Sequence, residues 1–214
     1  MSEMVKVVVD AMGGDNAPEE PVKAAVEAVK EKENIQVILT GVQDVIEAEL
    51  RKYPDYPKDR IRVVHASQVI ETAEPPVMAI QKKKDSSIVV GLNLVKKQEA
   101  DAFVSSGSTG AVLVGGQVIV GRIKGIRRPP LAPLIPTAKG VSLLIDCGAN
   151  VDARPDHLVQ FAQMGSIYME NVVGIKKPRV AIVNNGAEEE KGNALVKATL
   201  PLLKACKDMN FIGS

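Results

Sequence analysis

Apolar and polar positions alternate along this chain with two different periods. Short runs rich in Val and Ile, with few charges among them, are typical of strands buried in a parallel sheet. The predicted strands cover residues 5–9, 35–40, 61–65, 102–105, 141–145, 179–183 and 210–212. Between them, apolar residues recur three and four positions apart, which predicts amphipathic helices. These helices are expected to begin at about 18, 42, 74, 87, 110, 155 and 195.

The apolar faces of the predicted helices and the positions of the prolines add detail to this prediction. In the first helix Val22, Ala25, Val26 and Val29 fall on one face. The proline-rich segment 129–136 is incompatible with a central strand or a helix. In the last helix we predict a kink at Pro201 and a buried face made of residues 195, 199, 202 and 206.

Strands that alternate with helices predict an α/β fold with a mostly parallel sheet and helices on both faces. We interpret residues 1–214 as a single α/β catalytic region. A parallel α/β fold normally covers its last strand with a helix, so we expect the sequence to be truncated after residue 214.

Composition excludes several classes of protein. Lys and Arg number 27 against 26 Asp and Glu, and a net charge of +1 does not indicate nucleic-acid binding. Cys147 and Cys206 fit neither a disulfide framework nor a zinc pattern, so we expect reduced thiols and a cytoplasmic protein. No signal peptide is expected, and the longest nearly apolar run, 110–121, is too short to span a bilayer.

Four strands are followed by polar loops that contain glycine. The loops are Asp10–Asn16, Ser105–Gly110, Asp146–Asp152 and Asn184–Asn193. Because the carboxyl ends of parallel strands lie along one edge of a sheet, we expect these loops to converge on one ligand site. The second loop leads from a strand into a helix, where unpaired N–H groups and the helix dipole favour an anion.

The side chains of these loops suit anion binding better than metal binding. No His or Cys has metal-ligand spacing, and His65 and His157 are expected to be structural. Four loop aspartates, at 10, 15, 146 and 152, could hold Mg²⁺, but we favour hydrogen bonds to loop backbones, so no metal and no cofactor are predicted.

Six short motifs, in this order, resemble the phosphate acyltransferases of bacterial phospholipid synthesis. They occupy residues 9–15, 106–111, 120–129, 146–152, 164–166 and 190–193, and the resemblance extends from residue 7 to residue 214. It implies a fold related to phosphate acetyltransferases and isopropylmalate dehydrogenases. It also implies transfer of a fatty acyl group from acyl carrier protein to inorganic phosphate, which gives an acyl phosphate for phosphatidic acid synthesis.

The same resemblance implies a homodimer that is cytoplasmic and attached peripherally to the inner face of the membrane. In the family a further C-terminal third carries more of the site, part of the dimer interface and the membrane-facing helices. This sequence departs from the family pattern at Ser108, Ala187 and Pro201.

We assign site residues on this basis. Lys191 is predicted to stabilise the developing oxyanion or the leaving thiolate, with Asn193 orienting it or the substrate. The residues predicted to bind phosphate or substrate are Asp10, Gly13, Gly14, Ser106, Gly107, Ser108, Thr109, Gly110, Asp146 and Asn150. Arg127 and Arg128 are predicted to dock the acidic carrier protein.

Two alternatives stay open from the sequence. One is a metal- and nicotinamide-dependent hydroxyacid dehydrogenase on the same scaffold, and the other is an inactive, truncated domain that binds anions or partners. Phosphate-dependent release of thiol from an acyl carrier protein thioester separates the acyltransferase from both.

Overall fold

The computed structural model describes residues 3–186, 188 and 190–214, so Ala187 and Glu189 of the last polar loop lie outside the described residues. Its contacts group the chain into two compact units, residues 1–122 and 123–214. The prediction of a single catalytic region that lacks its C-terminal third stays a prediction.

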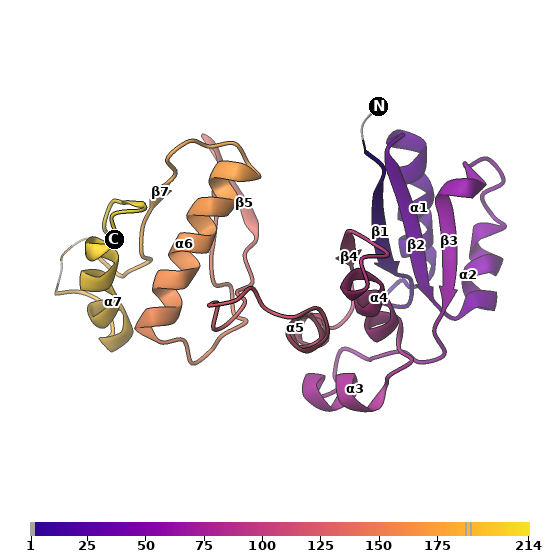
Figure 1. Cartoon of the computed structure of the whole chain (residues 1–214), viewed down its shortest axis with the longest axis horizontal. Coiled ribbons are helices and arrows are strands. Elements are labelled where there is room, and N and C mark those ends of the chain that lie inside the picture. The colour runs from indigo at the N-terminus through magenta and orange to yellow at the C-terminus, as the bar shows by residue number, and fades with distance from the viewer. Residues whose placement is uncertain (1–2, 187, 189) are drawn as a thin grey trace. The chain divides into compact units, whose positions relative to one another are not determined.

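The first unit is built on a four-stranded parallel sheet (Figure 1). Its strands are β1 (Val5–Asp10), β2 (Ile35–Gly41), β3 (Ile61–His65) and β4 (Ala102–Val104), in the order β3-β2-β1-β4. Val8 of β1 is in register with Ile38 of β2, and Val9 is in register with Val104 of β4. The sequence-based prediction of a mostly parallel sheet is therefore confirmed.

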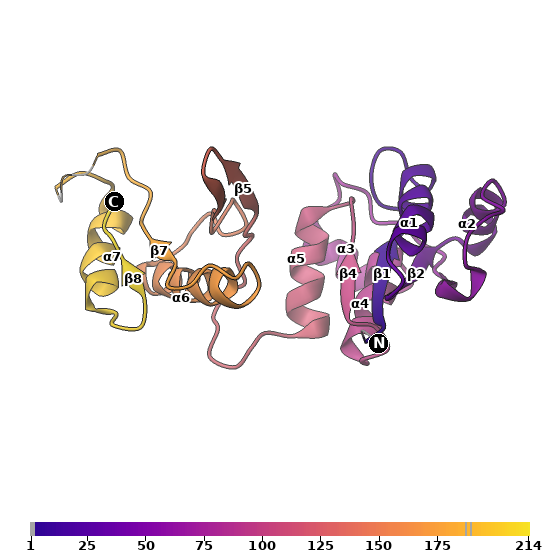
Figure 2. The ribbon, with the colours of Figure 1, turned by 90° about the horizontal axis from the view of Figure 1, so that it is seen from above.

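Helices cover both faces of this sheet, as its alternating side chains require. The helices of the first unit are α1 (Glu19–Glu31), α2 (Gln43–Leu50), η1 (Lys58–Arg60), α3 (Pro76–Lys82), α4 (Ser87–Lys96), α5 (Thr109–Gly115) and the π-helical turn η2 (Gly116–Val120). Val26 of α1 and Ile46 of α2 pack with Leu39 on one face. The other face is covered by α4 (Figure 2). Leu94 of this helix packs with Val8 and Ile38.

Local sequence accounts for these helices. Val22, Ala25, Val26 and Val29 are all buried, as their spacing predicts, and two glutamates occupy the first turn of α1. Ser86 begins α4 as an N-cap, because its side chain accepts a hydrogen bond from the Val89 N–H. The predicted cap at 85–87 is confirmed.

The second unit contains two small sheets and two long helices. Its elements are β5 (Leu134–Thr137), β6 (Gly140–Leu143), α6 (Pro155–Asn171), β7 (Arg179–Val180), α7 (Ala194–Ala205) and β8 (Asn210–Phe211). β5 and β6 form an antiparallel hairpin, and β7 pairs with β8 in parallel. Residues 134–136 of the proline-rich segment lie in the hairpin strand β5, and the segment forms neither a central strand nor a helix, as predicted.

The buried face of α7 differs from the prediction. Thr199, Leu200 and Leu203 are buried, whereas Leu202 is 44% exposed. Both faces have helical spacing, and packing against α6 selects the face that includes Leu200 and Leu203. Periodicity alone was wrong about Leu202 because α7 is apolar on more than one side.

Candidate functional site

The carboxyl ends of β1 and β4 bring the first two polar loops together. Val9 pairs with Val104, so the next residues of the two segments, Asp10 and Ser105, lie side by side. The Ser105 hydroxyl donates a hydrogen bond to Asp10 Oδ2 over 2.8 Å. Two of the four loops that were expected to converge therefore lie together in the first unit.

Asp10 is a buried carboxylate at the centre of this contact, with 1% of its surface exposed. Its Oδ1 accepts a hydrogen bond from the Met12 N–H at 3.1 Å, while Oδ2 accepts the Ser105 hydroxyl. The Ser105 oxygen in turn accepts the Gly107 N–H at 3.0 Å. A buried charge is stable only when it is hydrogen-bonded, and here the bonds also join one loop to the other.

Glycines allow the two loops to approach this closely. A Cβ atom on Gly13 would lie 2.4 Å from Asp10 Oδ2 and 2.9 Å from the Gly107 nitrogen. Gly14 has a φ of +100°, and a Cβ there would lie 3.0 Å from the Ser106 Cβ. Residues larger than glycine would push the loops apart, so these glycines set the shape of the candidate site.

The residues of the loop 105–110 that carry hydroxyl groups have two kinds of surroundings, because one is buried and caps a helix while others are exposed. Ser108 is 3% exposed and caps α5, because its hydroxyl accepts the Ala111 N–H at 3.3 Å. Ser106 and Thr109 are exposed at the start of the same helix. The structure therefore leaves two residues with hydroxyl groups, Ser106 and Thr109, exposed to solvent, where an oxyanion could accept hydrogen bonds.

Helix α3 packs against the start of α5. A Cβ atom on Gly110 would lie 2.5 Å from Pro76 Cγ, so the ring of Pro76 in α3 packs directly against the backbone of α5 at Gly110. The segment before α3 is held by Asp85, which accepts the Ser67 N–H at 2.9 Å as well as the Ser67 hydroxyl. These hydrogen bonds from Ser67 lower the pKa of the Asp85 carboxyl.

In the second unit, Asp146 organises the third polar loop. Its Oδ1 accepts the Leu131 N–H at 2.6 Å, and its Oδ2 accepts the Asn150 N–H at 2.7 Å. The Asn150 amide donates to the Pro129 carbonyl oxygen at 3.1 Å. Asp146 and Asn150 are thus brought together, and both stabilise the backbone of 129–131, as we favoured for the loop aspartates.

The fourth loop precedes α7. Asn193 caps this helix, because its Oδ1 accepts the Val196 N–H at 2.9 Å. Lys191 is exposed, and its backbone N–H donates to the Glu188 carbonyl oxygen at 3.0 Å. Lys191 and Asn193 therefore both lie within the three residues that precede α7.

Asn184 is a residue of this loop that was not singled out from the sequence. Its Oδ1 lies 2.7 Å from where a Cβ of Gly192 would be, and Gly192 has a φ of +97°. Its Nδ2 is buried and has no hydrogen-bond partner within the described part of the chain. The sequence signal was an asparagine directly after a predicted strand, which is also common in ordinary turns.

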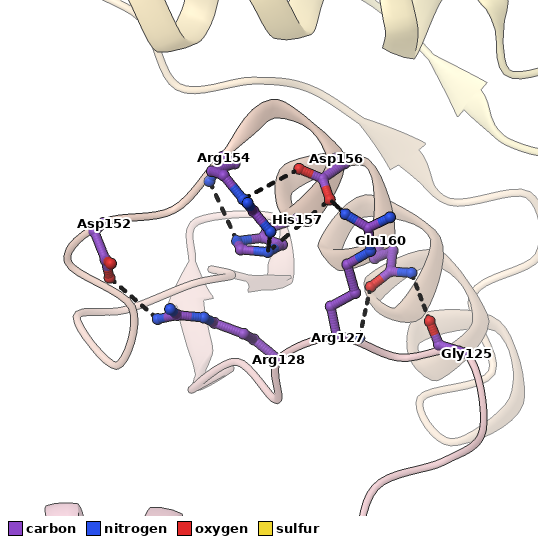
Figure 3. A network of polar contacts seen from close by, with 8 residues as sticks. All are labelled: Gly125, Arg127, Arg128, Asp152, Arg154, Asp156, His157 and Gln160. Carbon is purple, nitrogen blue, oxygen red and sulfur yellow. Dashed lines mark hydrogen bonds and ion pairs between the residues drawn. The ribbon is translucent and has the colours of Figure 1, made fainter.

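Arg127 and Arg128 both make ion pairs near the start of α6 (Figure 3). Arg127 pairs with Asp156, and Arg128 Nη1 lies 3.1 Å from Asp152 Oδ1. The side chain of Gln160 accepts the Arg127 N–H at 3.0 Å. The two arginines are therefore fixed on the surface of the second unit by its own acidic residues.

Both histidines have structural surroundings, as predicted. His157 is 2% exposed and its Nδ1 accepts the Arg154 N–H at 3.2 Å, which caps α6. His65 Nδ1 accepts the Gln43 N–H at 3.3 Å. Among the described residues, no group of three or more His, Cys, Asp or Glu is arranged to hold a metal ion. None of the described helices is both long and apolar enough to cross a membrane.

In the first unit, the hydrogen bond from Ser105 to Asp10 joins two of the predicted loops. The assignment of these loops to phosphate, and the convergence of all four, stay predictions. So does the docking role of the two arginines.

Comparison with known proteins identifies relatives of the whole chain. A family model described as "Fatty acid synthesis protein" matches residues 5–214. The phosphate acyltransferase of Clostridium botulinum (strain Alaska E43 / Type E3) is 52% identical over 210 residues, which are 98% of this chain and 63% of that protein. That of Alkaliphilus oremlandii (strain OhILAs) is 55% identical over 212 residues, or 98% of this chain and 62% of that protein. The chain therefore spans less than two thirds of the length of these relatives.

Solved structures show a similar fold. A phosphotransacetylase from Streptococcus pyogenes matches with a TM-score of 0.72 at 18% identity, covering 98% of this chain and 67% of that one. The EutD phosphotransacetylase from Staphylococcus aureus matches with a TM-score of 0.68 at 17% identity, covering 99% and 68%. The predicted relation to the phosphate acetyltransferase fold is confirmed.

Proposed function

The chain belongs to the family of fatty acid synthesis proteins, together with bacterial phosphate acyltransferases, and from this membership we propose that the whole protein transfers an acyl group to inorganic phosphate. The identity of 52–55% to two phosphate acyltransferases over 98% of the chain is the observation that carries the proposal. We propose acyl carrier protein as the donor and phosphatidic acid synthesis as the pathway that uses the acyl phosphate.

The geometry of the first unit supports a phosphate site. Exposed Ser106 and Thr109 stand at the start of α5, on a loop that Asp10 and Gly13 hold in place. Hydroxyl and backbone N–H donors on a rigid loop bind an oxyanion without a large loss of conformational entropy. In this proposal Asp10 and Ser108 shape the loop, while its exposed groups contact phosphate.

The reaction needs orientation and charge stabilisation more than it needs a base. A phosphate oxygen attacks the thioester carbonyl carbon, a C–O bond forms, and a tetrahedral oxyanion develops. The C–S bond then breaks, which gives an acyl phosphate and the thiolate of the carrier. We propose that the exposed ammonium of Lys191 stabilises the oxyanion or this thiolate, and that Asn193, by capping α7, positions Lys191.

A single assay tests this role. In the full-length protein, phosphate-dependent release of thiol from an acyl carrier protein thioester is measured for Lys191→Ala. Loss of one oxyanion donor costs about a hundredfold or more in kcat, with a smaller effect on the KM for phosphate. Lys197→Ala, which removes an exposed lysine from α7 itself, is the matched control and should keep its turnover. Unchanged turnover in Lys191→Ala would remove this lysine from the mechanism.

We propose that the carrier protein docks at Arg127 and Arg128. Their present partners, Asp156 and Asp152, are 40% and 78% exposed, and ion pairs at such positions contribute only about 0–1 kcal/mol. Carboxylates of an acidic carrier could therefore replace them at little cost. Charge reversal of both arginines should weaken carrier binding and flatten its salt dependence. An unchanged affinity and salt dependence would rule out this docking surface.

Oligomeric state and location follow from the family resemblance. We propose a homodimer that acts in the cytoplasm and attaches peripherally to the inner face of the membrane. Light scattering on the full-length protein tests the dimer, and flotation with anionic vesicles tests the attachment.

A further inference from the structure

The polar loop that precedes α7 folds back on itself, so that its first residues lie against its last ones. The Oδ1 atom of Asn184 lies 2.7 Å from the position that a Cβ atom on Gly192 would occupy. Gly192 has a φ of +97°, in the left-handed region that favours glycine. A residue without a side chain is therefore required where this part of the loop meets the Asn184 amide.

A second contact joins the same two parts of the loop. A Cβ atom on Gly186 would lie 3.0 Å from Cγ and 3.6 Å from Cβ of Lys191, so the aliphatic part of this lysine packs against the Gly186 backbone. The backbone N–H of Lys191 also donates to the Glu188 carbonyl oxygen at 3.0 Å. Asn184 and Gly186 thus contact two neighbouring residues, Gly192 and Lys191, whose position decides where the ammonium group lies.

The side-chain amide of Asn184 has one orientation that suits its surroundings. Its Oδ1 accepts the backbone N–H of Asn185 at 2.9 Å, and this hydrogen bond assigns the oxygen and the nitrogen of the amide. Its Nδ2 is buried, and among the residues that the structure describes it meets no acceptor. A buried donor without an acceptor lowers stability, and an apolar side chain of similar size would avoid that loss. The arrangement that this asparagine imposes on the loop therefore explains it better than the stability it adds.

We propose that Asn184 is a positioning residue for acyl transfer. Its amide holds Gly192 in the left-handed conformation, and this fixes the point from which the side chain of Lys191 extends. Placement matters because misplacing a catalytic group by about 1 Å costs about a hundredfold in rate. The inference rests on the proposed function, since Asn184 acts through Lys191 and not through contact with the substrate.

Kinetics of the full-length protein test this role. Asn184→Ala should lower kcat for phosphate-dependent release of thiol about tenfold and change the KM for phosphate by less than about twofold. Gly186→Ala places a Cβ 3.0 Å from Lys191 Cγ and should lower kcat in the same way, because it displaces the same side chain. Asn185→Ala removes the exposed side chain of the neighbouring asparagine and is the matched control, with unchanged kcat.

A double variant separates positioning from an independent effect. If Asn184 acts only through Lys191, adding Asn184→Ala to Lys191→Ala should leave kcat at the value of Lys191→Ala alone. Effects that multiply would show that the two residues act separately.

Hydrogen exchange follows the geometry of the loop without reference to turnover. Asn184→Ala should speed exchange of the Lys191 amide several-fold, whereas the amide of Val196, which Asn193 caps, should exchange as before. Asn184→Asp keeps an oxygen that accepts the Asn185 N–H, so it should retain the protection of the Lys191 amide.

Three results would overturn the inference. These are unchanged exchange of the Lys191 amide in Asn184→Ala, unchanged kcat in that variant, and multiplied effects in the double variant. Each leaves the proposed function standing as long as Lys191→Ala by itself loses turnover. Normal turnover of Lys191→Ala, in contrast, contradicts the proposed role of Lys191 and removes the positioning role of Asn184 with it.

Discussion

Replacing Gly13 with alanine should separate the two loops of the first unit. The added Cβ would lie 2.4 Å from Asp10 Oδ2, 2.9 Å from the Gly107 nitrogen and 3.0 Å from Ser105 Oγ. Ordinary contacts of a Cβ begin at 3.4 Å, so the Asp10 carboxylate would have to move by about 1 Å. That movement would lengthen the hydrogen bond that Ser105 donates to Asp10.

The size of the effect follows from two terms. Overpacking a well-packed site costs about 1–3 kcal/mol, and a hydrogen bond to a charged group contributes about 1.5–3 kcal/mol. The loops can move to accommodate the added methyl group, which relieves part of the overpacking cost and part of the hydrogen-bond loss. We therefore expect the free energy of unfolding of the first unit to fall by about 2 kcal/mol. With a urea m-value of about 2 kcal/mol/M, the unfolding midpoint would fall by about 1 M.

Urea unfolding followed by tyrosine fluorescence measures this change, because Tyr53 and Tyr56 both pack against the core of the first unit. Gly116→Ala is the control. It has helical dihedrals and nothing within 4 Å of its added Cβ, so alanine there should stabilise by about 0.5–1 kcal/mol. A Gly13→Ala protein as stable as the unmodified chain would refute the reasoning, since the loops would then tolerate separation.

Three further predictions concern the elements that support the site. Asn193→Ala should destabilise α7 by about 0.5–2 kcal/mol through loss of its N-cap, whereas Asn193→Asp should not; thermal unfolding measures both. Ser108→Ala should likewise increase hydrogen exchange in the first turn of α5, while Ser108→Thr should preserve protection. The pKa of Asp85 is lowered from its ordinary value of 3.8, so its stabilising effect is present above that pH and is lost as the pH falls through the lowered value. Asp85→Asn should therefore be less stable than the unmodified chain at neutral pH, with the difference shrinking below pH 3.8 in an acid titration; a constant difference would contradict this.

Much of the fold could be predicted because it depends on local patterns. The strand at 5–10 and the helix from 19 to 31 follow from β-branched runs and from the spacing of Val22, Val26 and Val29. The cap at Ser86 is a property of the residue itself. Parallel pairing could be predicted because strands that alternate with helices pair in parallel.

The candidate site could be predicted only as a set of loops. The sequence indicated that Asp10 and Ser105 follow parallel strands, but not that β1 and β4 are neighbours. Because β1 and β4 are neighbours, the two loops lie together, and the Ser105 hydroxyl donates a 2.8 Å hydrogen bond to Asp10. In the same way, nothing local shows that both oxygens of Asp146 accept backbone N–H groups.

By itself, the amino-acid sequence determined the class of fold, the order of most elements and the residues that begin its helices. Each of these depends on side chains a few positions apart, whose spacing is written in the chain. The tertiary structure decided which strands are neighbours, which face of α7 is buried and which hydroxyls of the loop 105–110 are used for capping. These depend on contacts between residues far apart in the chain, where several arrangements satisfy the local pattern and packing selects one.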